Sequence, residues 1–142
     1  MITIRTAILS ITLFLGLSGE AMARGWSREW DFIGVAEDRT EVLVQRQSVR
    51  ELPPSPERRF AVRQVMVALD TGDSEGIAPS RRVVLFRYDC TGRRMLIAAA
   101  TDYAADGSVL ARNSVAGDWA DGYEPVEPDT LGATIMAQTC GV

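Results

Sequence analysis

The order of apolar and polar residues between positions 30 and 114 predicts a series of short β-strands. Apolar side chains alternate with polar ones over short runs, and Gly, Pro and Asp separate these runs. In the run 60–69 both sides of the strand are largely apolar, which indicates a central strand. Prolines at 53, 54 and 56 cannot donate to a strand ladder, so they separate the second run from the third. The runs predict strands at 30–35, 40–45, 60–69, 83–90, 93–103 and 109–114.

Two of these runs form a predicted hairpin that defines one face of the sheet. Residues 83–90 and 93–103 flank Thr91-Gly92, which we expect to form a two-residue turn. Because cross-strand partners share a face, this register aligns apolar residues in one row and places Cys90 at its end. The predicted pairs are Cys90–Arg93, Tyr88–Met95, Phe86–Ile97 and Val84–Ala99.

A helical pattern replaces the alternation near the C-terminus. Asp129 precedes the apolar run 131–140, and Gly141 follows it. Asp is a common N-cap and Gly a common helix stop, so we expect a helix over 131–140 that is capped by Asp129. At about 100° per residue, one side of this helix carries Leu131, Ile135, Met136 and Cys140.

Residues 1–23 have the organisation of a secretory signal peptide. Arg5 precedes the apolar stretch 6–17, and Ala21-Met22-Ala23 supplies the small-x-small pattern that signal peptidase requires. The stretch is shorter than the roughly 20 residues of a membrane-spanning helix, and a retained anchor is the alternative. We therefore expect cleavage after Ala23 and a single mature domain, 24–142, without a membrane span. No cysteine lies near the cleavage site, so a lipid anchor is not expected.

The chain contains two cysteines, Cys90 and Cys140. An even number of cysteines in a small exported domain favours a structural disulfide. The alternatives are a redox-active pair, which usually occurs as Cys-x-x-Cys, and a metal site, for which two thiols are a weak ligand set. A Cys90–Cys140 bond would hold the helix against the hairpin. The predicted fold class is α+β: an antiparallel sheet of about five or six strands with a C-terminal helix packed on one face, closed by one disulfide.

The composition excludes several kinds of chemistry. The chain of 142 residues has a net charge of −4, contains no His, and all 15 of its basic residues are Arg. His-based general bases, Cys/His zinc sites and Schiff-base lysines are therefore excluded. An acidic chain is also a poor binder of nucleic acid. We expect no catalytic residues, no metal and no cofactor, and we predict that the protein is not an enzyme.

The segment that begins at Asp70 has two functional interpretations. Asp70-Thr71-Gly72 is similar to the aspartic-protease signature, but the catalytic dyad needs two carboxylates and the chain has one copy. Asp70, Asp73 and Glu75 are an alternative calcium site, although their spacing differs from the EF-hand pattern. A strand that ends in a Gly-containing turn explains the segment without either activity.

Arginine pairs and aromatic residues supply the candidate binding residues. The pairs at 58–59, 81–82 and 93–94 flank strand ends. They either gather into a site for an anion or an acidic partner, or remain solvated charges that discourage strand-to-strand aggregation. Trp and Tyr dominate the hot spots of protein interfaces and are also common in cores. The candidate binding residues are Arg81, Arg82, Arg93, Arg94, Trp119 and Tyr123.

Several of these segments also match a known pattern. They are Asp31-Phe32-Ile33-Gly34, the strand 86–90, Trp119 in a loop, Glu127-Pro128-Asp129-Thr130, and a terminal helix that ends at Cys140. Over residues 30–140 the chain resembles the surface-adhesin protein E family of bacterial exported proteins. The resemblance implies an antiparallel sheet with a C-terminal helix and a Cys90–Cys140 disulfide. The founding adhesin is a surface lipoprotein that binds laminin, vitronectin and plasminogen, so the resemblance also implies a binding role.

These observations predict an exported, non-enzymatic binding or adhesin-like domain of a bacterial cell envelope. The expected partner is a protein or a component of the envelope or matrix. A periplasmic structural or accessory role with a protein partner is the alternative. An open edge strand would also allow a homodimer. The expected location is the periplasm or the cell exterior.

Overall fold

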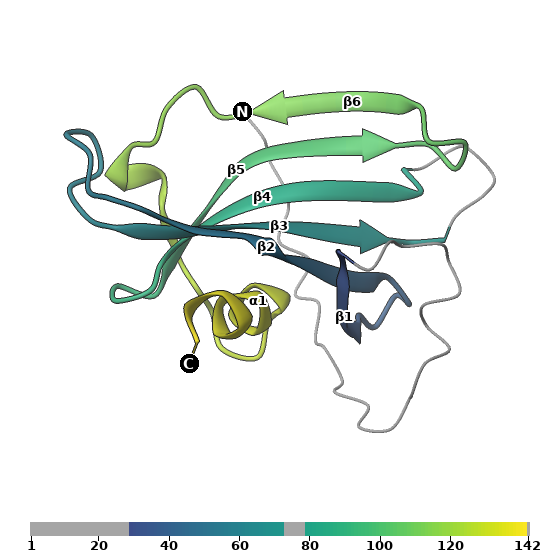
Figure 1. Cartoon of the computed structure of the whole chain (residues 1–142), viewed down its shortest axis with the longest axis horizontal. Coiled ribbons are helices and arrows are strands. Elements are labelled where there is room, and N and C mark those ends of the chain that lie inside the picture. The colour runs from purple at the N-terminus through teal and green to yellow at the C-terminus, as the bar shows by residue number, and fades with distance from the viewer. Residues whose placement is uncertain (1–28, 73–78, 142) are drawn as a thin grey trace.

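The computed structural model describes residues 29–72 and 79–141, which form one antiparallel sheet and an α-helix (Figure 1). Consecutive strands are neighbours, so the sheet is a meander in the order β1-β2-β3-β4-β5-β6, and β7 pairs with the start of β5. The predicted signal peptide lies outside the described residues. The elements are β1 (Asp31–Val35), β2 (Glu41–Leu52), β3 (Val62–Asp70), β4 (Arg81–Asp89), β5 (Arg94–Tyr103), β6 (Val109–Ser114), the 3-10 helix η2 (Ala120–Gly122), β7 (Glu124–Pro125) and α1 (Leu131–Cys140).

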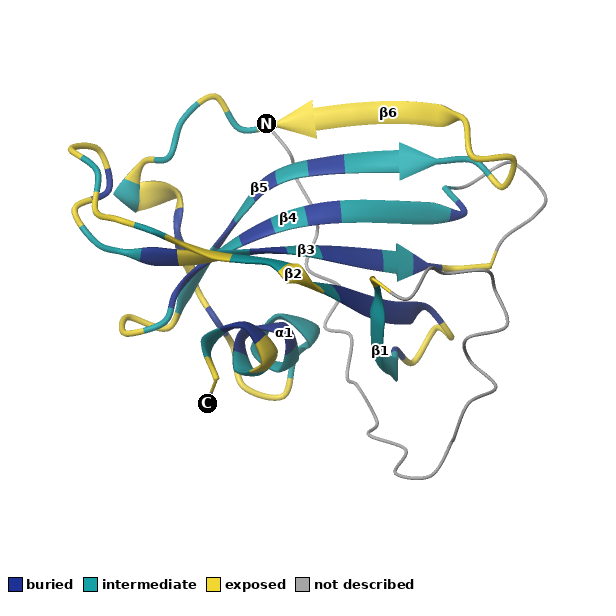
Figure 2. Ribbon diagram, viewed as in Figure 1, coloured by how far each residue is buried: buried dark blue, intermediate teal, exposed yellow. Residues whose placement is uncertain are grey.

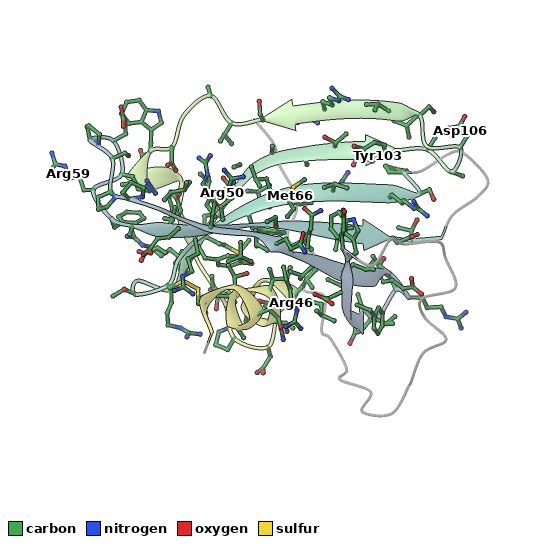
Figure 3. All side chains as sticks on the ribbon, in the orientation of Figure 1. Arg46, Arg50, Arg59, Met66, Tyr103 and Asp106 are labelled. Carbon is green, nitrogen blue, oxygen red and sulfur yellow. A yellow bond between two sulfur atoms is a disulfide. The ribbon has the colours of Figure 1, made fainter. Side chains whose placement is uncertain are left out.

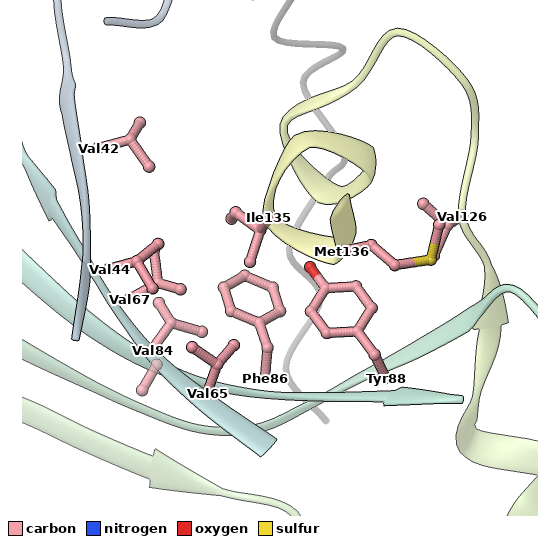
Figure 4. Packing of buried hydrophobic residues seen from close by; sticks show 11 residues of the cluster. Val42, Val44, Val65, Val67, Val84, Phe86, Tyr88, Val126, Ile135 and Met136 are labelled. Atoms are coloured by element: carbon pink, nitrogen blue, oxygen red, sulfur yellow. The ribbon is translucent and has the colours of Figure 1, made fainter. Parts of the chain in front are cut away.

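Helix α1 lies across one face of the sheet, so the predicted α+β fold is confirmed (Figure 1). Side chains alternate between the two faces of each strand, and this alternation turns Val65 of β3 and Phe86 of β4 toward the helix. Ile135 and Met136 of α1 pack against them from the other side (Figure 4). The buried members of this core are Val42, Val44, Val65, Val67, Val84, Phe86, Tyr88, Ala100, Val126, Ile135 and Met136.

The helix is tied to the sheet at both of its ends. Near its start, the buried Tyr88 hydroxyl donates to the carbonyl oxygen of Gly132 at 3.0 Å. At its end, a disulfide joins Cys140 to Cys90, which directly follows β4. The predicted disulfide is therefore confirmed. Because the bond connects residues 50 positions apart, it constrains a large part of the unfolded chain.

The limits of α1 agree with the prediction, but its N-cap does not. The N-cap is Thr130, whose side chain accepts from the amide of Ala133 at 3.2 Å. Asp129 instead lies one residue earlier with a φ of 59°, a left-handed conformation. This turn places the Thr130 hydroxyl, rather than the Asp129 carboxylate, over the first turn of the helix. Gly141 ends the helix with a φ of 74°, as expected for a glycine stop.

The register of the β4–β5 hairpin is partly as predicted. Tyr88 pairs with Met95 and Phe86 with Ile97, which confirms two of the four predicted pairs. A bulge at residue 98 then shifts the register, so the predicted Val84–Ala99 pair is wrong and Val84 lies opposite residue 100. The predicted Cys90–Arg93 pair is also absent from the ladder. Strand pairing stops at Asp89 and residue 94, and four residues form the turn.

Residue conformation explains why the turn is longer than predicted. A two-residue type I′ turn needs a positive φ at both central residues, and Thr91, a β-branched residue, adopts this conformation poorly. In the structure the positive φ falls on Arg93, at 52°. The Asp89 carboxylate supports the turn by accepting the amide of Gly92 at 2.9 Å.

The two edges of the sheet differ in exposure. Every residue of the edge strand β6 is exposed, including the large apolar residues Val109 and Leu110 (Figure 2). The opposite edge strand, β1, is short and half-buried. β2 is longer than predicted and ends at Leu52, directly before the prolines. Within the described ranges, no helix has the length and apolar character needed to cross a membrane.

Candidate functional site

A second cluster of side chains lies on the sheet face that points away from α1. Because Phe86 faces the helix, the next residue, Arg87, faces the other side together with its cross-strand partners Gln64 and Leu96. Figure 3 shows Arg50 and Met66 on this same side of the sheet. The apolar part of the cluster contains Val62, Leu96 and Tyr123, with Leu52, Phe60 and Val115 packed around it.

The polar part of this cluster is centred on the carboxylate of Asp118. The Tyr123 hydroxyl donates to Oδ1 at 2.6 Å. Arg58 Nε lies 3.2 Å from Oδ2, and Arg87 Nη1 lies 3.5 Å from the same oxygen. Three segments that are distant in sequence therefore meet at one carboxylate. We refer to Arg58, Arg87, Asp118 and Tyr123 as the Asp118 cluster.

Tyr123 connects the apolar and polar parts. Its side chain is buried, and its ring meets Phe60 edge-to-face with 5.1 Å between the ring centroids. Burial raises the pKa of the Tyr123 hydroxyl, and the hydrogen bond to Asp118 raises it further. The phenol is therefore protonated at neutral pH and acts as a fixed donor to the carboxylate.

The proline-containing segment after β2 positions Arg58. A compact turn forms there, in which the amide of Arg59 donates to the Ser55 carbonyl at 2.7 Å and the amide of Arg58 reaches the Ser55 hydroxyl at 3.2 Å. The Arg58 side chain is only 3% exposed and donates through Nη2 to the Pro53 carbonyl at 2.6 Å. Its Nη1 is buried and has no hydrogen-bond partner within the described ranges.

Trp119 follows Asp118 directly and projects from this anchored segment. It is 59% exposed, the largest value among the exposed large apolar residues of the described chain. Asp118 holds the segment on one side, and on the other the amide of Ala120 donates to the Glu57 carbonyl at 3.3 Å. The indole lies against Gly117, where an added Cβ would come within 2.4 Å of the indole nitrogen. The large apolar side chain of Trp119 is therefore exposed to solvent while its backbone is anchored on both sides.

Three of the predicted binding residues lie near the Asp118 cluster, at the end of the sheet that holds the β4–β5 turn. Trp119 and Tyr123 belong to the segment just described, where Trp119 is exposed and Tyr123 is buried. Arg94 is close by: it pairs with the Asp89 carboxylate, Nη2 to Oδ2, at 2.8 Å, and its guanidinium lies 4.5 Å from the centre of the Phe60 ring. Arg94 therefore has a clear packing role beside the site.

The other three predicted residues do not join this site. Arg93 is exposed at the tip of the β4–β5 turn. Arg81 and Arg82 lie at the opposite end of β4, where Arg81 Nε is 3.3 Å from Asp70 and Arg82 pairs with Asp102 through two hydrogen bonds. The hypothesis that the three arginine pairs gather at one place is therefore wrong, because the pair 81–82 lies one full length of β4 away from the pair 93–94.

The surroundings of Asp70 and Arg82 concern the protease-like and calcium-site interpretations of the segment that begins at Asp70. Asp70 is buried and accepts the amide of Gly72 at 2.8 Å, which is the geometry of a turn. Residues 73–78, which contain two of the three carboxylates of the alternative calcium site, lie outside the described part. Arg82 and Leu131 line a cavity of about 240 Å³ beside the start of α1. In the ranges 29–72 and 79–141 no group of three or more potential metal ligands occurs.

Sequence reasoning did not identify Arg87 and Asp118. Arg87 lies between two buried aromatic residues, and the alternation places it on the opposite face from them. That position was a usable signal, because a charged residue inside an apolar strand needs a partner when the face is covered. Asp118 carried no such signal, since its partners come from residues 58, 87 and 123.

Comparisons with protein-family models, with curated proteins and with solved structures give no match for this chain. The proposals below therefore rest on the residues and their geometry.

Proposed function

We propose that this chain is an exported, non-enzymatic protein-binding domain of a bacterial envelope, similar in role to the surface-adhesin protein E family. Its contact residue is Trp119. The exposure of this indole, on a backbone anchored at both neighbouring residues, is the observation that carries the proposal. Large aromatic side chains are the commonest anchors of protein interfaces.

The anchoring supports a binding role over an incidental exposure. A side chain that is ordered before binding loses less conformational entropy when it is buried by a partner. At Trp119 the ordering comes from Asp118, whose carboxylate meets two arginines and a tyrosine hydroxyl. Such a network holds the loop in one position and presents the indole in a defined direction.

Two features of the sequence agree with this function. The N-terminal segment has the pattern of a signal peptide, which would bring the domain to the envelope. The absence of His and Lys removes the commonest general bases and amine nucleophiles. A periplasmic accessory role is the alternative; it uses the same contact residue and differs in location. Pairing of two chains through the exposed strand β6 stays a prediction.

Affinity capture with a matched pair of variants tests this function. The tagged full chain, Trp119→Ala and Leu110→Ala are used to capture partners from two sources: an extract of the bacterial cell envelope, and a set of extracellular-matrix proteins. Both residues are exposed apolar side chains, at 59% and 52%, so both variants remove similar surface without opening the core. We expect a partner that is captured by the parent chain and by Leu110→Ala and is lost with Trp119→Ala. Equal capture by all three proteins, or capture of none, would contradict the proposal.

A further inference from the structure

The Asp118 carboxylate is surrounded by more positive charge than it neutralises. Arg58 and Arg87 both face its Oδ2, at 3.2 and 3.5 Å. Each arginine also donates to a neutral acceptor: Arg58 to the Pro53 carbonyl and Arg87 to the Gln64 side-chain oxygen. Two positive charges thus share one negative charge: Arg58 is covered, and Arg87 and Asp118 are partly exposed. Because a charge removed from water needs a partner, this arrangement favours an additional anionic group.

The buried donor of Arg58 is a second, independent observation. Nη1 is inaccessible to solvent and has no hydrogen-bond partner in the described part of the chain, although the side chain is 97% covered. A guanidinium usually meets a carboxylate through two parallel N–H bonds. Asp118 faces Nε, and the orientation of this contact is not that of a hydrogen bond. The Nη1 group of Arg58 can therefore still donate a hydrogen bond to a further acceptor.

We propose that Arg58 and Arg87 form a carboxylate-binding site that Asp118 occupies in the free protein and that an acidic side chain of the protein partner occupies in the complex. The inference rests on the proposed function, since the acidic side chain enters beside Trp119. When Asp118 leaves the arginines, the Ala120–Glu57 bond still holds the loop that carries the indole. Tyr123, whose hydroxyl is held by its own packing against Phe60, donates to either carboxylate.

Asp118 and the partner then compete for the same arginines. Because Asp118 is part of the chain, it competes at an effective concentration on the order of millimolar. Its removal should therefore strengthen the binding of an external carboxylate. Trp119 is the neighbouring residue, so its fluorescence reports the exchange.

Titration of the full chain with a blocked tri-glutamate peptide, acetylated and amidated, tests the site without a natural partner. A blocked tri-glutamine peptide is the neutral probe. The variants are Asp118→Asn, which keeps an acceptor for Tyr123, Asp118→Ala, and Asp118→Asn combined with Arg87→Gln. Arg82→Gln combined with Asp118→Asn is the matched control, because Arg82 also pairs with an aspartate but lies at the far end of β4.

We expect tri-glutamate to bind Asp118→Asn or Asp118→Ala at least about tenfold more tightly than the parent chain. The Arg87→Gln double variant should lose this gain, the Arg82→Gln double variant should keep it, and tri-glutamine should not bind. Equal affinity of parent and Asp118 variants, no binding to either folded variant, or a gain that survives Arg87→Gln would overturn the inference. If tri-glutamate binds as expected while the Trp119 capture experiment fails, the carboxylate site stands and the proposed function fails.

Discussion

The Tyr123 hydroxyl donates to Asp118 Oδ1 at 2.6 Å, and this bond joins a buried aromatic residue to the residue that precedes the exposed Trp119. The order of the loop therefore depends on the packing of the sheet face beneath it. Tyr123 packs with Val62 of β3 and Leu96 of β5, so the position of the indole is connected to the strands themselves.

Removal of the Tyr123 hydroxyl should weaken the loop without disturbing the ring packing. A hydrogen bond to a charged acceptor contributes about 1.5–3 kcal/mol, and the partial exposure of Asp118 places Tyr123→Phe at about 1–2 kcal/mol of lost unfolding free energy. Denaturation in urea measures this loss. Time-resolved fluorescence anisotropy should also show faster local motion of Trp119. Tyr103→Phe, at the far end of β5, is the control, and an equal effect in both variants would exclude the connection.

Loss of the buried Arg58 should cost more stability than loss of the partly exposed Arg82. Arg58 is 3% exposed, so Arg58→Gln removes a buried charge that faces Asp118 together with its bond to the Pro53 carbonyl, and should cost about 3 kcal/mol of unfolding free energy. Arg82 is 38% exposed, and Arg82→Gln should cost less than about 1 kcal/mol because water screens its pair with Asp102. Chemical denaturation of both variants checks the difference. Similar losses would mean that burial does not govern these pairs.

Stability should decrease in alkaline solution because of Tyr88. Burial in the core raises the pKa of its hydroxyl, whereas in the unfolded chain the group ionises near its ordinary value of about 10. Above that pH the unfolded state has lost a proton that the folded state retains. The contribution is therefore complete below about pH 10 and is lost as the pH rises, at about 1.4 kcal/mol per pH unit.

Tyr88→Phe is the comparison for this prediction. The variant also loses the bond to the Gly132 carbonyl, which should cost about 1 kcal/mol at neutral pH. Between pH 8 and about 11.5 the unfolding free energy of the parent chain should fall toward that of the variant and drop below it above about pH 10.7. Parallel curves over this range would show that the Tyr88 hydroxyl is not shielded.

The Cys90–Cys140 bond should make a large contribution to stability. Cross-linking residues 50 positions apart lowers the entropy of the unfolded chain and corresponds to about 4 kcal/mol. The double variant Cys90→Ala, Cys140→Ala, compared with the oxidised parent by urea unfolding, should lose an amount of this size. Since typical domains have only about 5–15 kcal/mol in total, the variant should melt at a much lower temperature. A loss below about 1 kcal/mol would contradict this account.

Particular residues show which parts of the fold the sequence could predict. Except for β2, which continues to Leu52, the strand limits were predictable to within a few residues because the alternation ends at turn residues. The helix was predictable because helical spacing of apolar residues replaces the alternation before Gly141. The bulge at residue 98 was not, because Ala98, Ala99 and Ala100 are identical and carry no preference for either face. Thr130 replaced Asp129 as the cap because one residue turned into a left-handed conformation, which the composition of the turn did not indicate.

The site was less predictable than the fold for a physical reason. Trp119 and Tyr123 were found from residue type, since large aromatic residues serve either cores or interfaces. Trp119 is exposed and Tyr123 is buried because different residues cover the two rings. This cover depends on Phe60 and on the turn around Ser55. Charge pairs such as Arg58–Asp118 join distant segments, so no local pattern distinguishes them from solvated charges.

The most direct test of the central claim is photo-crosslinking in the living cell from residue 119 of the full chain. Benzoylphenylalanine replaces Trp119 in one variant and Asp106 in the other; Asp106 is exposed at the opposite end of the sheet (Figure 3). The account predicts a covalent adduct with one envelope protein from position 119 and none with that protein from position 106. Equal adducts from both positions, or an adduct from position 106 alone, would contradict it.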